Sequence, residues 1–208
     1  MSNYLDKIIY INLEYRTDRK AEIETELQQI ELMPIVERFE GIRVPEQGIL
    51  GCTKSHLAVI KLAKERGYRN VLVLEDDFEF LVSKNEFEEK LTQFFESSLG
   101  KTYDVCMITV NLYKTANETE SECPIMKRVL SSGSAAGYIV NQHYYDTLIK
   151  CWEDAWPLLE TTKRHWEYAN DVAWIKLQEK DNWYHFVDRL GKQRSGFSDN
   201  ANRIMDYN

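Results

Sequence analysis

Three consecutive carboxylates, Glu75, Asp76 and Asp77, directly follow the apolar run at residues 71–74. An unbroken apolar run predicts a strand that is buried on both faces, and ligands of open α/β sheets bind at the carboxyl ends of such strands. Three negative charges so close together repel one another, and a hard cation with oxygen ligands offsets that repulsion. The pattern predicts a site for Mn²⁺ or Mg²⁺ carrying a nucleotide diphosphate. The alternative is a solvated acidic turn.

Two arginines near the N-terminus form a second candidate group. Arg16 and Arg19 lie in a turn. A predicted strand at residues 7–13 precedes this turn, and a segment with helical periodicity follows it. Guanidinium groups suit phosphate oxygens, and the N-terminus of the following helix adds its dipole. Asn12 ends the strand with a side chain able to pair with a base or an amide. The turn is therefore a candidate diphosphate site, and simple solvation of the arginines is the alternative.

The start of a second predicted helix, at residues 48–56, is polar and cationic. It carries Lys54, Ser55 and His56 and leads directly into the strand that ends in the acidic cluster. These side chains are expected to face the phosphates from the side opposite the arginines. For His56, a structural hydrogen bond is the alternative.

Two further segments carry candidate contacts. Small residues at 131–137 allow a backbone to approach a ligand closely, so Ser134 and Ala135 are expected to contact it, with a tight turn as the alternative. Asp171, at the start of an apolar-periodic helix, is an isolated carboxylate suited to act as a general base. Capping that helix is its alternative role.

The elements that position these residues alternate between strands and helices. Strands are expected over residues 7–13, 36–42, 71–74, 103–110, 126–130 and 183–187. Helices are expected to be capped by Thr17 or Asp18, by Thr53 or Ser55, and by Asn85 with Glu88, with Pro157 beyond the end of a later helix. Residues 111–125 are expected to form a surface loop or lid. The alternation predicts one α/β domain over residues 1–208, with a mixed, mostly parallel sheet flanked by helices.

The composition narrows the classes of partner. A hydrophobic share of 43% in 208 residues is enough for one sizeable core. The net charge of −8 argues against nucleic acid or an anionic membrane surface as partner. No apolar stretch has the ~18–20 residues of a membrane span. Without a signal peptide or an ER-retention signal, a cytoplasmic location is expected, which is the host cytosol if the protein is viral.

The cysteines are widely scattered and form no C-x-x-C pair. They are Cys52, Cys106, Cys123 and Cys151. This spacing indicates neither a zinc site nor a disulfide scaffold, so free thiols are expected.

Together, the motifs resemble glycosyltransferase family 25, which includes bacterial lipopolysaccharide sugar transferases and procollagen galactosyltransferases. The matching segments are INLEYRTDR at 11–19, GCTKSH at 51–56, LEDD at 74–77 and SAAGY at 134–138. They occur in the family's order and cover most of the chain. NDVAW at 170–174 and GKQRSGFSD at 191–199 look more like the collagen-modifying and viral branch.

The resemblance implies a GT-A-type, Rossmann-like fold and an inverting transfer of a hexose, galactose or glucose, from a UDP-sugar. The acceptor would be a hydroxyl of a protein side chain, as in hydroxylysine, or of a glycan. Glu75 and Asp77 would hold Mn²⁺ or Mg²⁺ with Asp76 in support, and the arginines would help stabilise the departing UDP. Asp171 would be the base. Glu75 departs from an Asp-x-Asp pattern, and a third protein ligand would come from His185 or from the polar tail at residues 191–199.

Two other functions compete with this reading. A non-catalytic module of the same fold would bind a glycan or a partner protein. A Mg²⁺-dependent nucleotidyltransferase or phosphatase would use the same acids, but the chain has neither an Asp-x-Asp-x-Thr motif nor a Gly-x-x-x-x-Gly-Lys loop.

Overall fold

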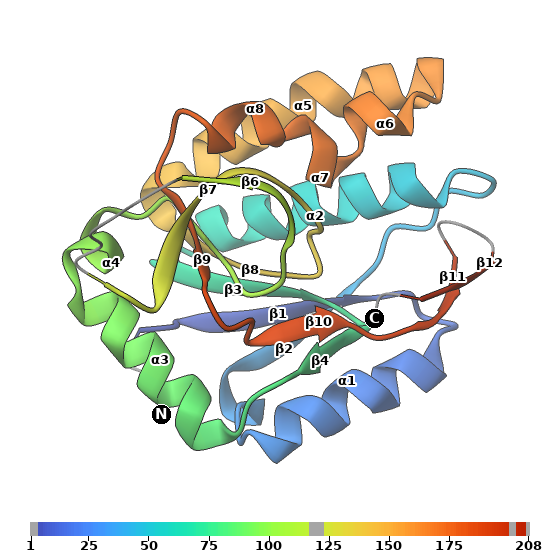
Figure 1. Ribbon diagram of the computed structural model, residues 1–208. Helices are drawn as coiled ribbons and strands as arrows, with labels where there is room; N and C mark the ends of the chain where they lie inside the picture. Colours follow the sequence, from blue (N-terminus) through green and yellow to red (C-terminus); the bar gives the residue numbers. More distant parts are fainter. Residues whose placement is uncertain (1–3, 117–122, 200–202, 207–208) are drawn as a thin grey trace.

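An eight-stranded sheet lies at the centre of the fold, between two layers of helices (Figure 1). The computed structural model describes residues 4–116, 123–199 and 203–206. The strands of the sheet are β1 (Lys7–Asn12), β2 (Val36–Glu40), β3 (Asn70–Glu75), β5 (Val105–Met107), β6 (Asn111–Thr115), β7 (Met126–Gly133), β8 (Gly137–Asn141) and β9 (Trp183–Phe186).

The sheet is mixed, with the strand order β2-β1-β3-β8-β5-β9-β7-β6. Strand β1 pairs in parallel with β2 and β3, and β5 pairs in parallel with β9. Strands β8 and β7 run antiparallel to both of their neighbours. All strands except these two therefore point the same way. This confirms the predicted single α/β domain with a mixed, mostly parallel sheet flanked by helices.

Helices connect most of the strands, and two small sheets lie beside the main one. The α-helices are α1 (Thr17–Gln29), α2 (Gly48–Glu65), α3 (Lys84–Glu96), α4 (Ser98–Thr102), α5 (Tyr145–Thr162), α6 (His165–Tyr168), α7 (Asn170–Ala173) and α8 (Ile175–Gln178), and the 3₁₀ helices are Met33–Ile35 and Gln142–Tyr144. The small sheets pair β4 (Phe78–Phe80) with β10 (Gly191–Gln193), and β11 (Gly196–Ser198) with β12 (Arg203–Met205). Within the described residues, none of the helices is long and apolar enough to span a bilayer.

Strand β3 contributes to the core on both faces of the sheet. Leu72 and Leu74 pack in the layer that contains α1 and α3, whereas Val71 and Val73 pack in the layer that contains α2 and α5 (Figure 1). All four side chains are fully buried. Successive side chains of a strand point to opposite faces, so only a continuous apolar run fills both layers. The predicted buried strand before the acidic cluster is confirmed.

The predicted caps of the first two helices are wrong. Thr17 and Asp18 lie inside α1, and among the described residues no side chain caps its start. Helix α2 begins at Gly48, so Thr53 and Ser55 also lie inside it. Their hydroxyls donate to carbonyl oxygens four residues earlier, at 2.9 and 2.7 Å. Hydroxyl side chains have this bond available within a helix, so they do not always mark its start.

Three other boundaries also differ from prediction. Ser83, rather than Asn85, caps α3 and accepts the N–H of Glu86 at 3.4 Å. Pro157 lies inside α5, where buried side chains before and after it keep the helix packed. Part of the predicted 111–125 loop is strand β6, whose side chains are mostly exposed and therefore show no apolar alternation. Residues 117–122 of that loop lie outside the described residues.

Candidate functional site

A cleft of about 1050 Å³ opens where β1 and β3 end. Because β8 runs antiparallel to β3, with Leu74 opposite Gly137, the segment before β8 reaches the same edge of the sheet. Most of the predicted site residues line this cleft: Arg19, Ser55, His56, Glu75, Asp76, Asp77, Ser134, Ala135 and Asp171. The topology thus brings together motifs that are far apart in the sequence.

Asp76 and Asp77 share a counter-ion. Arg19 Nη1 lies 3.2 Å from Asp76 Oδ1 and 2.9 Å from Asp77 Oδ2. Asp77 Oδ1 is buried and has no hydrogen-bond partner within the described residues. Burial and the neighbouring Glu75 raise the pKa of Asp77 to about 7, although Arg19 opposes this. The carboxyl therefore lacks sufficient positive charge around it, and a cation at Oδ1 would supply that charge.

Glu75 lies in different surroundings. Its Oε1 faces His56 Nε2 at 3.1 Å and Cys52 Sγ at 3.6 Å. Burial by itself would raise the pKa of Glu75, but the hydrogen bond with His56, together with the charges of His56 and Arg19 and the contact with Cys52, lowers it overall. Its Oε2 accepts from the amide of Gln193 at 3.4 Å, and this amide also lies 3.4 Å from Asp77 Oδ2. Gln193, which lies on β10, thus contacts both Glu75 and Asp77.

The arginine turn differs from its predicted role in two respects. Asn12 is almost fully buried and donates to Asp76 Oδ2 at 2.8 Å, so it positions an acid instead of presenting a free amide. Arg16 does not line the cleft; it forms ion pairs with Asp18 and Asp199, and the hydrogen bond to Asp18 is the main reason that its pKa is raised. Of the two arginines, only Arg19 faces the acidic cluster.

The expected position of Lys54 opposite the arginines is wrong. Its Nζ pairs with Glu160 of α5 at 2.9 Å and lies 4.3 Å from the centre of the Trp156 ring. A helix advances 100° per residue, so Lys54 lies on a different side of α2 from His56, which faces Glu75. Ser55 is nearly inaccessible to solvent. Its hydroxyl accepts a hydrogen bond from Ile42 N at 2.8 Å, which holds the loop before α2 against the helix.

Asp171 and Ser134 meet across the cleft. The backbone N–H of Ser134 donates to Asp171 Oδ2 at 3.2 Å, and Ser134 has a left-handed φ of +74°. Burial raises the pKa of Asp171, while this hydrogen bond opposes the shift. The alternative role of Asp171 as a helix cap is wrong, because Ala169 occupies the cap position of α7. Ala135 is buried beside Ser134 on the cleft wall.

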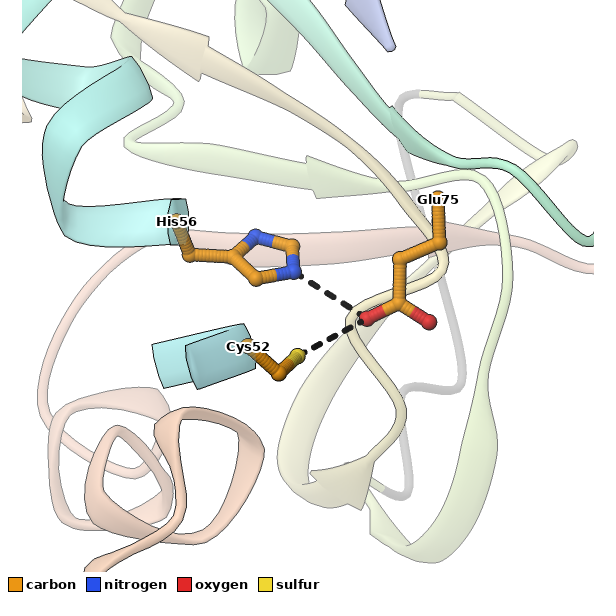
Figure 2. Close-up of side chains that lie close together, drawn as sticks. All are labelled: Cys52, His56 and Glu75. Atoms are coloured by element: carbon orange, nitrogen blue, oxygen red, sulfur yellow. Dashed lines mark hydrogen bonds and ion pairs between the residues drawn. The ribbon is translucent and has the colours of Figure 1, made fainter. Parts of the chain in front are cut away.

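Other polar residues of the cleft were missed or misplaced by the sequence analysis. Cys52 and Gln193 both contact Glu75, and the close-up in Figure 2 shows Cys52 and His56 approaching the same oxygen of that residue. The four-residue spacing of Cys52 and His56 on a helix was the signal available for Cys52. His185, the suggested third ligand, does not line the cleft and donates from Nδ1 to the carbonyl of Phe186 at 2.8 Å.

The chain matches no protein-family model and no curated protein. Among solved structures, it is similar to an active-site mutant of the galactosyltransferase LgtC, with 12% identity and a TM-score of 0.49 over 86% of this chain and 72% of that one. A glycosyltransferase involved in glycosylation of the PBCV-1 major capsid has 9% identity and a TM-score of 0.45 over 88% and 92%. GlyE of Streptococcus pneumoniae TIGR4 has 13% identity and a TM-score of 0.47 over 89% of this chain but 46% of its own. The function must therefore be inferred from the side chains of the cleft.

Proposed function

We propose that this protein is a glycosyltransferase that binds a UDP-sugar together with Mn²⁺ or Mg²⁺ in the cleft at the end of β3. The observation that carries the proposal is Asp77 Oδ1, a buried carboxylate oxygen without a partner in the described structure, in a group whose pKa is raised to about 7. Mg²⁺ bound by one or two carboxylates and by substrate phosphates fits such an oxygen. The residues present therefore suit the cation that the motifs imply.

The donor side uses residues on both edges of the acidic cluster. Asp77 and Glu75 Oε2 would hold the cation, while Asn12 keeps Asp76 in place through its 2.8 Å hydrogen bond. When bound, the cation supplies Lewis-acid stabilisation of the departing diphosphate. Arg19 adds a fixed positive charge beside the same phosphates.

Asp171 is the proposed base for the acceptor. Its raised pKa makes it a better proton acceptor near neutral pH than an ordinary aspartate, and the Ser134 N–H orients Oδ2. As the acceptor oxygen bonds to the anomeric carbon, the bond from that carbon to the UDP oxygen breaks. The hydroxyl proton passes to the Asp171 carboxylate. Attack from the opposite side inverts the anomeric configuration.

The finer assignment follows from the motifs. We place the protein in glycosyltransferase family 25, near its collagen-modifying and viral branch, with galactose or glucose as the transferred hexose. The acceptor is a hydroxyl of a protein side chain, of the hydroxylysine type, or of a glycan. A cleft of about 1050 Å³ is large enough for a donor and part of an acceptor.

Calorimetry with UDP, in the presence and absence of Mn²⁺, tests the donor site. Heat of binding is expected only with the metal, and Asp77→Asn is expected to abolish it. A wild-type protein that gives no heat under either condition would overturn the proposal. A thermal-shift comparison of UDP-, GDP- and CMP-sugars, with and without Mn²⁺, then identifies the donor. A ligand that binds the folded state raises the melting temperature.

One observation favours the alternative of a non-catalytic binding module. Both arginines already have partners in the tail, Arg16 through Asp199 and Arg19 through the carbonyl of Phe197. Release of UDP from a bound UDP-sugar separates the two functions. An enzyme transfers the sugar to water or to an acceptor and releases UDP within hours, whereas a binding module retains the intact donor.

A further inference from the structure

A thiol, an imidazole and a carboxylate converge on the wall of the cleft (Figure 2). Glu75 Oε1 lies 3.1 Å from His56 Nε2 and 3.6 Å from Cys52 Sγ, and all three atoms lie within 4.8 Å of one another. Ligand atoms around a tetrahedral zinc ion, at bond lengths of about 2.0–2.3 Å, are separated by about 3.3–3.8 Å. The two separations from Glu75 Oε1 are therefore close to the spacing that a small tetrahedral cation requires, and His56 Nε2 and Cys52 Sγ are at most 4.8 Å apart.

Two regular elements hold this arrangement. Cys52 and His56 are four residues apart on α2 and so share one helix face. Glu75 is the last residue of β3, and the four side chains before it, at residues 71–74, are fully buried. Because the ligands come from a long helix and a central strand, little ordering is needed when an ion binds.

Neighbouring side chains also support a metal site. Tyr138 is fully buried on β8, and its hydroxyl lies 2.8 Å from His56 Nδ1. A metal-binding histidine almost always uses its second nitrogen in this way, which fixes the ring and directs the other nitrogen at the ion.

We propose that Cys52, His56 and Glu75 bind Zn²⁺ through Sγ, Nε2 and Oε1, with a fourth position open to the cleft. A mixed sulfur, nitrogen and oxygen donor set suits zinc, whereas Mg²⁺ and Mn²⁺ prefer oxygen ligands. On binding, the Cys52 S–H bond breaks, its proton passes to solvent, and the sulfur bonds to the ion without any redox change. The scattered cysteines gave no indication of this site, because only one of its ligands is a cysteine.

The zinc site is distinct from the proposed site for the donor's cation. It uses Glu75 Oε1, whereas Oε2 points toward Gln193, whose amide also contacts Asp77. One carboxylate thus faces both positions. The inference goes beyond the proposed function, since a protein with this site binds zinc whether or not it transfers a sugar.

The proposal is tested by absorption spectroscopy. The full chain is first stripped of metal with a chelator and is then titrated with Co²⁺. Tetrahedral cobalt bands and a thiolate-to-cobalt charge-transfer band are expected at one equivalent, and Zn²⁺ is expected to displace Co²⁺ with a Kd of about 1 µM or tighter. Cys52→Ser is expected to remove the charge-transfer band and to weaken zinc binding by at least ~100-fold. Cys151→Ser is the matched control, because that thiol is buried elsewhere, on α5, and the band is expected to persist.

Three further variants complete the test. Tyr138→Phe keeps every ligand and is expected to weaken zinc binding by ~10–100-fold while retaining the charge-transfer band at saturation. His56→Gln provides a second ligand variant if circular dichroism shows that Cys52→Ser does not fold. Asp77→Asn is expected to keep the cobalt spectrum while losing the heat of UDP and Mn²⁺, so the two sites fail independently. A wild-type protein without a charge-transfer band, or a band that survives in folded Cys52→Ser, would overturn the proposal.

Discussion

Glu75 and Asp77 are two residues apart at the end of β3, yet their surroundings shift their pKa values in opposite directions. Glu75 is stabilised as a carboxylate by His56, and its pKa is lowered. Asp77 is buried beside Glu75 and Asp76, and one of its oxygens has no partner within the described structure. Its pKa is raised to about 7, mainly by this burial, although Arg19 pairs with its other oxygen. The difference teaches that an acidic run is not a uniform patch. Each carboxyl takes its chemistry from the element that it faces, which is α2 for Glu75 and α1 with β10 for Asp77.

The largest expected effect comes from Asp77→Asn on donor binding. Removal of the carboxylate with the unpartnered oxygen is expected to weaken UDP binding in Mn²⁺ by at least ~100-fold, because the cation loses its principal ligand. Calorimetry measures the change. Asp188→Asn is the control, since that aspartate is exposed and pairs with Lys90 at 3.1 Å. Equal UDP affinity in Asp77→Asn and wild type would contradict the role given to Asp77.

The same substitution is expected to stabilise the metal-free protein at neutral pH. Because the pKa of Asp77 is higher in the folded than in the unfolded state, its protonated carboxyl favours folding. This stabilisation is complete below the unfolded pKa of ~3.9 and is lost as the pH rises through about 7. Asp77→Asn should therefore gain stability over wild type between pH 4 and pH 8, by up to a few kcal/mol. Urea unfolding at several pH values measures this. A difference that does not change with pH would show that Asp77 is not destabilised by its charge.

Glu75→Gln is expected to have the opposite pH dependence. Because the pKa of Glu75 is lowered, its charge contributes stability above the unfolded value of ~4.3, and this is lost as the pH falls. The variant is expected to lose about 1–3 kcal/mol at pH 7, since His56 keeps a weaker partner, and less at pH 3. The same urea series measures it. Parallel pH profiles for Glu75→Gln and Asp77→Asn would remove the contrast between the two acids.

Lys54→Ala is expected to have the smallest effect. Its ion pair with Glu160 is partly exposed, so the loss in stability should be below ~1 kcal/mol. UDP affinity in Mn²⁺ should not change, because Lys54 faces α5 and not the cleft. Calorimetry and thermal melting measure the two quantities. A marked loss of UDP affinity would restore the phosphate contact that the sequence predicted for this lysine.

The sequence predicted the strands better than the contacts between them. The apolar run of β3 requires two covering layers, so both the strand and the position of the acids at its end were predictable. The partners of those acids were not, because they depend on pairings between distant segments. Gln193 reaches Glu75 only because β10 pairs with β4, and Lys54 turns away because α2 begins at Gly48. Edge strand β6 has exposed side chains and no apolar signal.

The position of β9 has a consequence for folding. This strand comes from residues 183–186, but it lies inside the sheet, parallel to β5 on one side and antiparallel to β7 on the other. A chain that stops at residue 182 would leave the backbone N–H and C=O groups of β5 and β7 without their partner and open to pairing with other chains. During synthesis, the sheet can close only after β9 has left the ribosome. We therefore expect the sheet to fold in a single step once β9 is available. Until then, the nascent chain is expected to require protection from aggregation.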